Sequence, residues 1–133
     1  MKTFIVTGAY GGIGKAICEL IGKDHENRVI LAGRNQQELN SAVEQIRTKT
    51  TNSAVQGYVV DFSSKKSIEQ FAEQLRDEPI DVLINNHATG PQKRQLTSDG
   101  IELQFATNVL GYVWMTNAFA SNLKNRSPTA RIV

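Results

Sequence analysis

Hydrophobic residues follow two different spacings along the chain, and their alternation predicts strands separated by helices. Strands are predicted at 4–6, 28–32, 54–60 and 80–84, and the apolar runs 4–6, 29–31 and 82–84 within them are typical of buried strands. Between these runs, apolar residues recur three and four positions apart, which places them on one face of a helix. The three predicted helical faces are Ile13, Ala16, Ile17, Leu20 and Ile21, then Leu39, Ala42, Val43 and Ile46, then Ile68, Phe71, Ala72 and Leu75.

Polar residues and a proline indicate where the predicted helices begin and end. Asn35, followed three residues later by Glu38, has the form of a capping box at the start of the second helix. Ser63 and Ser64 are cap candidates for the third helix. Pro79 closes the third helix, because proline cannot continue the helical hydrogen bonds.

The remaining pattern completes an α/β fold. A long apolar helix is predicted over 98–123, and 130–133 is predicted to begin a fifth strand. Strands separated by helices of this length imply right-handed crossovers and a parallel sheet. Apolar strands such as 82–84 fit a sheet covered on both faces. The predicted fold class is therefore α/β with a doubly wound parallel sheet, in one domain over 1–133.

The composition is typical of a soluble globular domain. Of the 133 residues, 40% are hydrophobic and 21% are charged. The net charge of +2 gives no support for a nucleic-acid partner. The apolar stretch at 109–115 is far shorter than the roughly 20 residues that a membrane span needs. Cys18 is the only cysteine, which excludes an intrachain disulfide. We expect a reducing, cytoplasmic setting, and no metal site is predicted.

A glycine-rich loop joins the first predicted strand to the first predicted helix. Its sequence is Thr7-Gly8-Ala9-Tyr10-Gly11-Gly12-Ile13-Gly14. Glycines in such a loop allow a tight turn, let the backbone approach a pyrophosphate and permit close packing of helix on strand. The following helix directs its N–H groups and positive dipole end at the phosphates. Because the loop follows a strand and opens a helix, it predicts a dinucleotide site rather than a flexible turn.

The end of the second predicted strand favours NADP(H) over NAD(H). An NAD-specific site places a carboxylate there to bond the ribose 2′-hydroxyl. Here the segment 32–35 contains no carboxylate, and the next one along the chain is Glu38. Gly33 removes the repulsion that a 2′-phosphate would meet, and Arg34 offers it a planar pair of donors. The alternative for Arg34 is an ordinary surface arginine.

The glycine spacing and several later segments resemble the short-chain dehydrogenase/reductase family. The loop has the family's TGxxxGxG pattern rather than the GxGxxG spacing of most dinucleotide folds. Further matches follow in the family's order, and they are Asp61-Phe62, Asn85-Asn86-His87-Ala88, Asp99-Gly100-Ile101-Glu102 and Asn108-Val109-Leu110-Gly111. The last two resemble the retinol-dehydrogenase-like branch. The resemblance covers the whole chain and implies a Rossmann-type fold.

The resemblance also implies a set of cofactor contacts. Asp61 would bond the adenine amino group, Phe62 would flank the adenine ring, and Asn86 would face the ribose on the nicotinamide side. The expected cofactor-binding residues are Gly8, Tyr10, Gly12, Ile13, Gly14, Arg34, Asn35, Asp61, Phe62 and Asn86. From the residues alone, Asp61 is equally a helix cap after a strand, and Asn86 is equally a turn residue.

Two residues depart from the family's pattern. His87 stands where the family has alanine, and we expect an exposed loop histidine there rather than a catalytic one. Tyr10 lies in a loop where the family has small or polar residues. It is expected either to cover the adenosine phosphate or to be exposed.

The residues that perform the family's chemistry are only partly present. That chemistry uses a serine, a tyrosine and a lysine four residues after the tyrosine, because hydride transfer to a carbonyl needs a proton donor with a pKa near the working pH. None of Tyr10, Tyr58 and Tyr112 is followed by lysine at the fourth position, so the YxxxK motif is absent. Asn108 matches the helix asparagine that supports the family's lysine. From the residues alone, Asn108 is a polar residue packed in an apolar helix.

We therefore expect the chain to be the N-terminal part of an NADP(H)-dependent oxidoreductase, with an incomplete fold that lacks the C-terminal strands and helices and is inactive alone. The parent would transfer hydride between its cofactor and a small, lipophilic alcohol or carbonyl substrate. The apolar helix over 98–123 is expected to leave a large exposed patch and to pair copies of the chain in a homo-oligomer. The alternative is a non-catalytic module that binds a nucleotide or dimerises through that helix.

Overall fold

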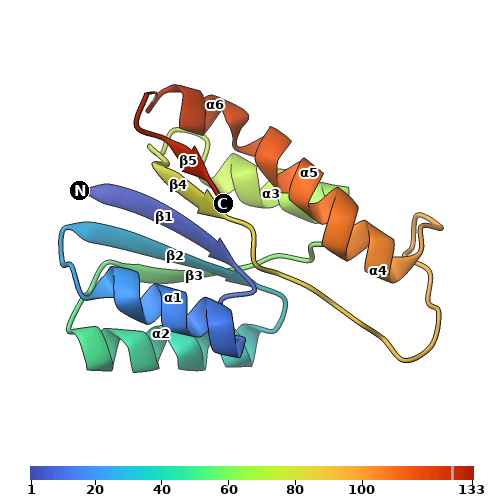
Figure 1. Ribbon diagram of the computed structural model, residues 1–133, viewed down its shortest axis with the longest axis horizontal. Coiled ribbons are helices and arrows are strands. Elements are labelled where there is room, and N and C mark those ends of the chain that lie inside the picture. Colours follow the sequence, from blue (N-terminus) through green and yellow to red (C-terminus); the bar gives the residue numbers. More distant parts are fainter. Residues whose placement is uncertain (127) are drawn as a thin grey trace.

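The computed structural model describes residues 1–126 and 128–133, and it contains a five-stranded sheet. The strands are β1 (Lys2–Thr7), β2 (Asn27–Gly33), β3 (Val55–Val59), β4 (Val82–Ile84) and β5 (Arg131–Ile132). Their order across the sheet is β3-β2-β1-β4-β5, and every neighbouring pair runs parallel. The chain winds outward from β1 in both directions (Figure 1), which confirms the predicted doubly wound α/β class.

Helices cover both faces of this sheet. They are α1 (Gly12–Gly22), α2 (Gln36–Thr50), α3 (Lys65–Gln74), α4 (Leu103–Phe105), the π-helical segment η1 (Ala106–Leu110), α5 (Gly111–Ala118) and α6 (Ala120–Lys124). Helices α1 and α2 lie on one face, and α3 lies with the α4–α6 run on the other (Figure 1). Within the part of the chain that the structure describes, no helix has both the length and the apolar character to cross a membrane.

Successive residues of β1 divide the core into two clusters. Ile5 packs in the cluster that contains Phe71 of α3 and Phe119 beside α5. Val6 packs in the cluster that contains Cys18 of α1 and Leu39 of α2. All six side chains are almost completely buried. The two clusters form because neighbouring side chains of a strand point to opposite faces of the sheet.

The predicted faces of the second and third helices are confirmed. Leu39 and Ile46 are fully buried in α2, and Ile68 and Leu75 are buried along α3 and its end. The predicted helix starts are also correct. The Asn35 side chain accepts the backbone N–H of Glu38 at 3.0 Å, and the Ser64 side chain does the same for Ser67 at 3.2 Å, so that each cap satisfies a donor at its helix start.

The predicted buried face of the first helix is only partly correct, because Ile17 and Ile21 pack against the core but are not fully buried. Ile13 and Leu20 are 72% and 68% exposed. The residues of α1 that are buried instead are Gly14, Cys18 and Gly22. A Cβ atom added at Gly22 would lie 3.4 Å from the Thr50 side chain, so the helix already packs closely there. Helix α1 therefore buries its small residues most deeply and leaves Ile13 and Leu20 exposed.

The helix predicted over 98–123 starts later and is interrupted. It begins at Leu103, because the Glu102 carboxylate caps it and accepts the backbone N–H of Phe105 at 2.7 Å. Gly100, just before it, has a φ of +77°, which lies outside the helical region. The chain then passes through the π turn of η1 and is broken again between α5 and α6, which ends at Lys124.

One side of this helical run carries exposed apolar residues. Phe105, Val109 and Val113 are 49%, 46% and 50% exposed. They are spaced four residues apart and form a stripe, which we call the outer stripe. The opposite side is buried and includes Met115 and Leu123. The expectation of exposed apolar surface on this helix is met by these three residues.

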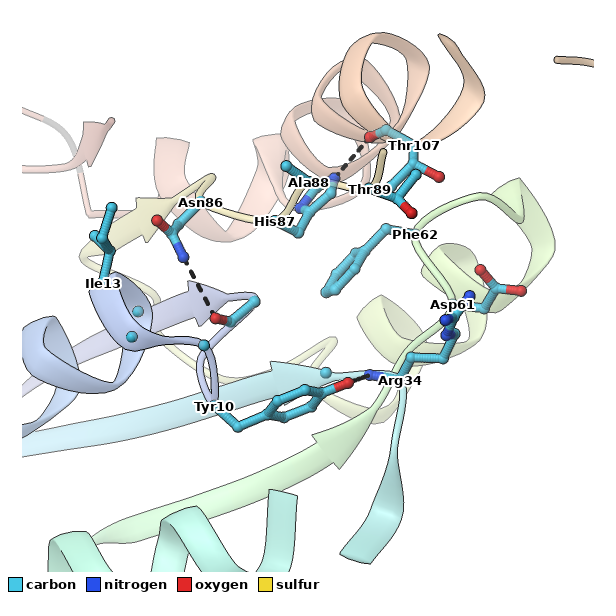
Figure 2. Close-up of a pocket in the computed structure, with 15 residues that line it drawn as sticks. Tyr10, Ile13, Arg34, Asp61, Phe62, Asn86, His87, Ala88, Thr89 and Thr107 are labelled. Carbon is cyan, nitrogen blue, oxygen red and sulfur yellow. Dashed lines mark hydrogen bonds between the residues drawn. The ribbon is translucent and has the colours of Figure 1, made fainter. Parts of the chain in front are cut away.

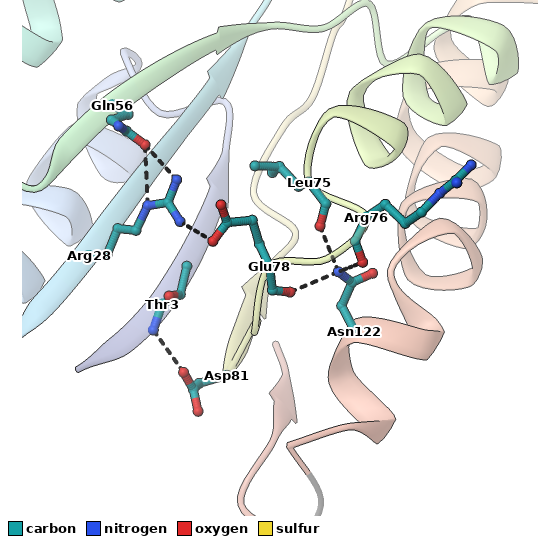
Figure 3. A network of polar contacts seen from close by, with 8 residues as sticks. All are labelled: Thr3, Arg28, Gln56, Leu75, Arg76, Glu78, Asp81 and Asn122. Carbon is teal, nitrogen blue, oxygen red and sulfur yellow. Dashed lines mark hydrogen bonds and ion pairs between the residues drawn. The ribbon is translucent and has the colours of Figure 1, made fainter.

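A buried asparagine of α6 closes the turn that follows α3. Asn122 is 5% exposed, and its Nδ2 donates to the carbonyls of Leu75 at 2.8 Å, Arg76 at 3.2 Å and Glu78 at 2.9 Å (Figure 3). Glu78 also pairs with Arg28 of β2 at 2.6 Å. Because buried carbonyls need donors, this single amide stabilises the whole connection between α3 and β4.

Candidate functional site

A pocket of about 470 Å³ opens at the carboxyl ends of β1, β2 and β4. Ligand sites commonly have volumes of about 300–1,000 Å³. The pocket lies where the strand order reverses beside β1, which is the place where open α/β sheets bind their ligands. All the expected cofactor-binding residues except Asn35 line it (Figure 2), namely Gly8, Tyr10, Gly12, Ile13, Gly14, Arg34, Asp61, Phe62 and Asn86.

Two glycines of the loop are required by close backbone approach. Gly8 has a φ of +63°, and a Cβ atom there would lie 2.9 Å from the Cα of His87. A Cβ atom at Gly14 would lie 2.8 Å from the Asn86 amide nitrogen and 3.0 Å from the Cα of Ala9. The loop therefore packs against the segment after β4 with no room for side chains at these two positions.

Thr7 and Asn86 fix the loop to the end of β4. The Asn86 side-chain amide donates to the carbonyls of Thr7 at 3.1 Å and Gly8 at 3.3 Å. In return, the Thr7 hydroxyl oxygen accepts the backbone N–H groups of Asn86 at 2.8 Å and His87 at 3.1 Å. Asn86 thus fixes the shape of the loop, and it also lines the pocket (Figure 2).

The N-terminus of α1 faces the pocket as an open anion site. Gly11 occupies the cap position without a side-chain hydrogen bond, and the first turn of the helix contains no acidic residue. A Cβ atom at Gly12 would meet nothing within 4 Å, so that there is space above the helix start. Ile13 lines the pocket and is mostly exposed. Free N–H groups and the positive end of the helix dipole favour a phosphate at this position.

Tyr10 covers the end of β2. Its hydroxyl oxygen accepts the backbone N–H groups of Arg34 at 3.2 Å and Asn35 at 3.0 Å. The ring lies against Gly33, where a Cβ atom would come within 2.8 Å of the ring carbon Cδ1. Tyr10 is thus packed on the chain rather than fully exposed, and its covering of the adenosine phosphate stays a prediction. Asn35 lies outside the pocket wall, because its side chain caps α2.

The Arg34 side chain is exposed and extends along the pocket on the side of Asp61 (Figure 2). Asp61 itself is half-buried, and its carboxylate accepts the backbone N–H of Ser63 at 3.0 Å and the hydroxyl of the same residue at 2.7 Å. The cap of α3 is Ser64 and not Asp61. The carboxylate therefore shapes the turn after β3 while it remains part of the pocket wall.

His87 is buried, which corrects the expectation of an exposed loop histidine. It is 3% exposed, and its ring stacks on Phe62 with centroids 4.0 Å apart and an interplanar angle of 10°. Its Nδ1 lies 2.8 Å from the Thr7 hydroxyl, and its Nε2 lies 2.9 Å from the carbonyl of Thr107 in η1. Burial lowers the pKa of His87 to about 4, although the bond to the Thr107 carbonyl opposes this. The ring is thus neutral at physiological pH.

The Asn108 side chain does not line the pocket but holds one of its walls. Its Nδ2 donates to the carbonyl of Thr89 at 2.9 Å, and its Oδ1 accepts the backbone N–H of the same residue at 2.8 Å. Thr89 and Thr107 both line the pocket and were not expected from the sequence. No local pattern identifies them, because their position depends on contacts between the segment after β4 and η1.

Within residues 1–126 and 128–133, no group of three or more His, Cys, Asp and Glu side chains is placed to hold a metal ion. The chemistry that the pocket supports is the binding of an extended anion along the glycine loop. One end of that ligand would lie near Arg34, and the other near Thr89 and Thr107.

Known proteins with similar sequences belong to one class. A family model described as short chain dehydrogenase matches residues 2–133. The chain is 39% identical over 130 residues to retinol dehydrogenase 13 of Mus musculus, an alignment that covers 96% of this chain and 39% of that protein. It is 38% identical over 118 residues to dehydrogenase/reductase SDR family member 12 of Bos taurus, covering 88% of this chain and 37% of that protein. The chain therefore spans about two fifths of the length of these curated relatives.

Solved structures give the same grouping. The alcohol dehydrogenase from the archaeon Thermococcus sibiricus, solved with 5-hydroxy-NADP, superposes with a TM-score of 0.79 at 27% identity, over 94% of this chain and 54% of that one. The short-chain dehydrogenase from Sphingobium yanoikuyae, solved with NADPH, superposes with a TM-score of 0.81 over 99% of this chain and 52% of that one. At 24% identity, this second match supports the fold alone.

Proposed function

Because this chain belongs to the short-chain dehydrogenase family, we propose that its pocket binds NADP(H) and that the protein transfers hydride between this cofactor and an alcohol or carbonyl substrate. The observation that carries the proposal is the pocket at the reversal of strand order, with the glycine loop and the open start of α1 on one wall. When bound, the nicotinamide of such a cofactor would supply or accept the hydride.

The residues present fit a dinucleotide. The loop leaves open space above Gly12, and the helix start behind it offers backbone donors without a competing carboxylate. Asp61 and Asn86 stand on opposite sides of the pocket and would meet the adenine and the nicotinamide-side ribose, respectively. Phe62 lines the pocket and would flank the adenine, while one face of its ring is stacked on His87.

The end of β2 supports NADP(H) over NAD(H). Gly33 supplies no carboxylate for a ribose 2′-hydroxyl, and the exposed guanidinium of Arg34 can bond a 2′-phosphate with two donors. Tyr10 adds a second contact. Because its hydroxyl oxygen already accepts two backbone N–H groups, its own proton is free to donate to a phosphate oxygen.

Titration of the purified protein with NADPH and NADH, followed by nicotinamide fluorescence, tests this proposal. Arg34→Ala is expected to weaken NADPH binding about ten- to hundredfold and to leave NADH binding unchanged, because it removes only the charge-assisted bonds to the 2′-phosphate. Arg94→Ala is the matched control, since Arg94 is exposed and outside the pocket. Equal affinity for both nucleotides would refute the NADP preference, and no binding of either would refute the nucleotide site.

We propose that Asn108 contributes to catalysis by positioning and that the proton donor for hydride transfer is not among these 133 residues, which contain no YxxxK motif. The Asn108 carboxamide makes hydrogen bonds to both the N–H and the carbonyl of Thr89 and acts through that residue. The chain by itself is therefore expected to bind the cofactor and to show no turnover. The substrate class we propose is a small, lipophilic alcohol or carbonyl, which the names of the retinol dehydrogenase relatives support.

The outer stripe supports a second role, the pairing of two copies of the chain. Phe105, Val109 and Val113 are half-exposed on one side of the helical run, and burying such residues against a copy would remove them from water. Light scattering after size-exclusion chromatography is expected to show a dimer that Val113→Lys dissociates. Leu20→Lys, at a more exposed apolar position of α1, should leave the dimer intact. A monomer at all concentrations would exclude this pairing.

A further inference from the structure

His87 links two elements that are far apart in the sequence. Its Nδ1 lies 2.8 Å from the hydroxyl of Thr7 at the end of β1, and its Nε2 lies 2.9 Å from the carbonyl of Thr107 in η1. A carbonyl only accepts, so that Nε2 must carry the proton and Nδ1 is left as an acceptor. The Thr7 hydroxyl also lies 3.3 Å from the Ile84 carbonyl, but it is closer to Nδ1 and donates to it. The ring is held in its plane by Phe62, stacked at 4.0 Å, and by the edge of Tyr112 at 4.7 Å. His87 is therefore fixed in position and tautomer.

The bond to Thr107 falls where the helix departs from α geometry. In an α-helix the N–H of Gly111 would bond the carbonyl of Thr107, four residues earlier. Here it bonds the carbonyl of Ala106 instead, five residues earlier, which makes η1 a π turn. The Thr107 carbonyl, relieved of the Gly111 donor, receives the His87 donor.

Gly111 is shaped to this arrangement. A Cβ atom there would lie 2.8 Å from His87 Nε2 and 2.7 Å from the carbonyl oxygen of Phe62. The histidine, the π turn and the glycine thus fit one another, and a side chain at residue 111 would push the ring away from Thr107. This mutual fit is a property of these particular residues and not of the glycine loop.

The π turn controls a wall of the pocket. Thr107 lines the pocket directly, and the next residue, Asn108, holds Thr89 through two hydrogen bonds to its backbone. Any shift of the turn would move both Thr107 and Thr89, which line the pocket.

We propose that His87 is a positioning residue that holds η1 in its π turn and thereby sets the Thr89–Thr107 wall against which the cofactor binds. The inference rests on the proposed nucleotide function of the pocket. It assigns to His87 a role that acts through the Thr107 carbonyl rather than through contact with the reacting atoms.

Substituting His87 by glutamine or by asparagine tests its two hydrogen bonds one at a time, because the two side chains differ in length. Glutamine places its amide nitrogen near the position of Nε2 and can still donate to Thr107, whereas asparagine reaches only as far as Nδ1 and Thr7. His87→Ala removes both bonds. We expect His87→Ala and His87→Asn to weaken NADPH binding about tenfold, and His87→Gln to stay within about threefold of the unaltered protein. His25→Gln, at an exposed histidine outside the pocket, should bind as the unaltered protein does.

A second readout is independent of the cofactor. Crystal structures of the nucleotide-free variants show whether the Gly111 N–H bonds Ala106 or Thr107. The expected result is a return to Thr107, and thus to α geometry, in the Ala and Asn variants but not in the Gln variant. Should the unaltered protein bind no NADPH, the proposed function fails, and this geometry alone decides the role of His87. Equal NADPH affinity in the Asn and Gln variants, or a π turn that persists in the Asn variant, would overturn the inference; the comparison holds even if the Ala variant does not fold.

Discussion

Lowering the pH from 7 to 4 is expected to destabilise the fold through His87. The pKa of this ring is about 4 in the fold, mainly because of burial, against an ordinary value of 6.5. The contacts give a further reason. The Thr7 hydroxyl oxygen already accepts two backbone N–H groups, from Asn86 and His87, so that a proton on Nδ1 would face an oxygen with no lone pair left. The folded state therefore favours the neutral ring.

The sign and size of the effect follow from proton linkage. Because the folded pKa lies below the unfolded one, the stabilisation is fully present above pH 6.5 and is lost as the pH falls toward 4. A difference between 6.5 and about 4 corresponds to about 3 kcal/mol in the free energy of unfolding at about 1.4 kcal/mol per pH unit. This is a large share of the roughly 5–15 kcal/mol by which domains are stable.

Urea unfolding at several pH values between 7 and 4 measures this loss. His87→Gln serves as the reference, because it keeps a donor toward Thr107 and has no proton to bind. Protonation of carboxylates affects both proteins equally, so that the difference between their unfolding free energies isolates the histidine. His25→Gln should retain the full loss. The reasoning is refuted if the unaltered protein and His87→Gln lose stability in parallel over this range.

Two further changes test the packing around the site. Asn122→Ala is expected to lower the free energy of unfolding by about 1–3 kcal/mol in urea titrations, because three carbonyls lose their buried donor (Figure 3). The control is Asn117→Ala, exposed on α5, which should change the free energy of unfolding by less than about 0.5 kcal/mol. Equal effects of the two substitutions would contradict the role given to Asn122. Gly14→Ala is expected to weaken NADPH binding by at least about tenfold, because its Cβ atom would press the Asn86 amide and the loop backbone apart. Gly90→Ala is the control, since a Cβ atom there meets nothing within 4 Å, and an unchanged affinity in Gly14→Ala would refute the close-packing argument.

The sequence predicts the parts of the fold in which large apolar residues face the core. The spacing of Leu39 and Ile46 locates the buried side of α2, and the central strands β1, β2 and β4 are found because each contains a compact apolar run. Helix α1 escapes this reasoning, because its buried side consists of Gly14, Cys18 and Gly22, while the larger Leu20 points outward. The spacing of hydrophobic residues does not reveal a helix face whose buried positions are glycines and a small residue.

The candidate site divides in the same way. The glycine loop and the end of β2 are recognisable because their residues are contiguous in the sequence and each has a known task. The burial of His87 is not recognisable, because it depends on the Thr107 carbonyl of a π turn 20 residues later in the chain. The interruption of the long helix escapes as well, since no proline marks η1 and the contact proposed to hold it, from His87 to Thr107, is a tertiary one.

The rate at which the single thiol of the chain reacts with an alkylating reagent measures how often the fold opens. Cys18 is fully buried on the sheet-facing side of α1, and burial raises its pKa to about 12, so that the native state offers a thiol reagent almost no thiolate. Alkylation can then proceed only through molecules in which α1 has left the sheet, and each such molecule gains the mass of one label. Under native conditions the labelling rate counts these rare openings. Because the first turn of the same helix lines the pocket, a ligand bound there should slow the labelling in proportion to the fraction of protein that it occupies.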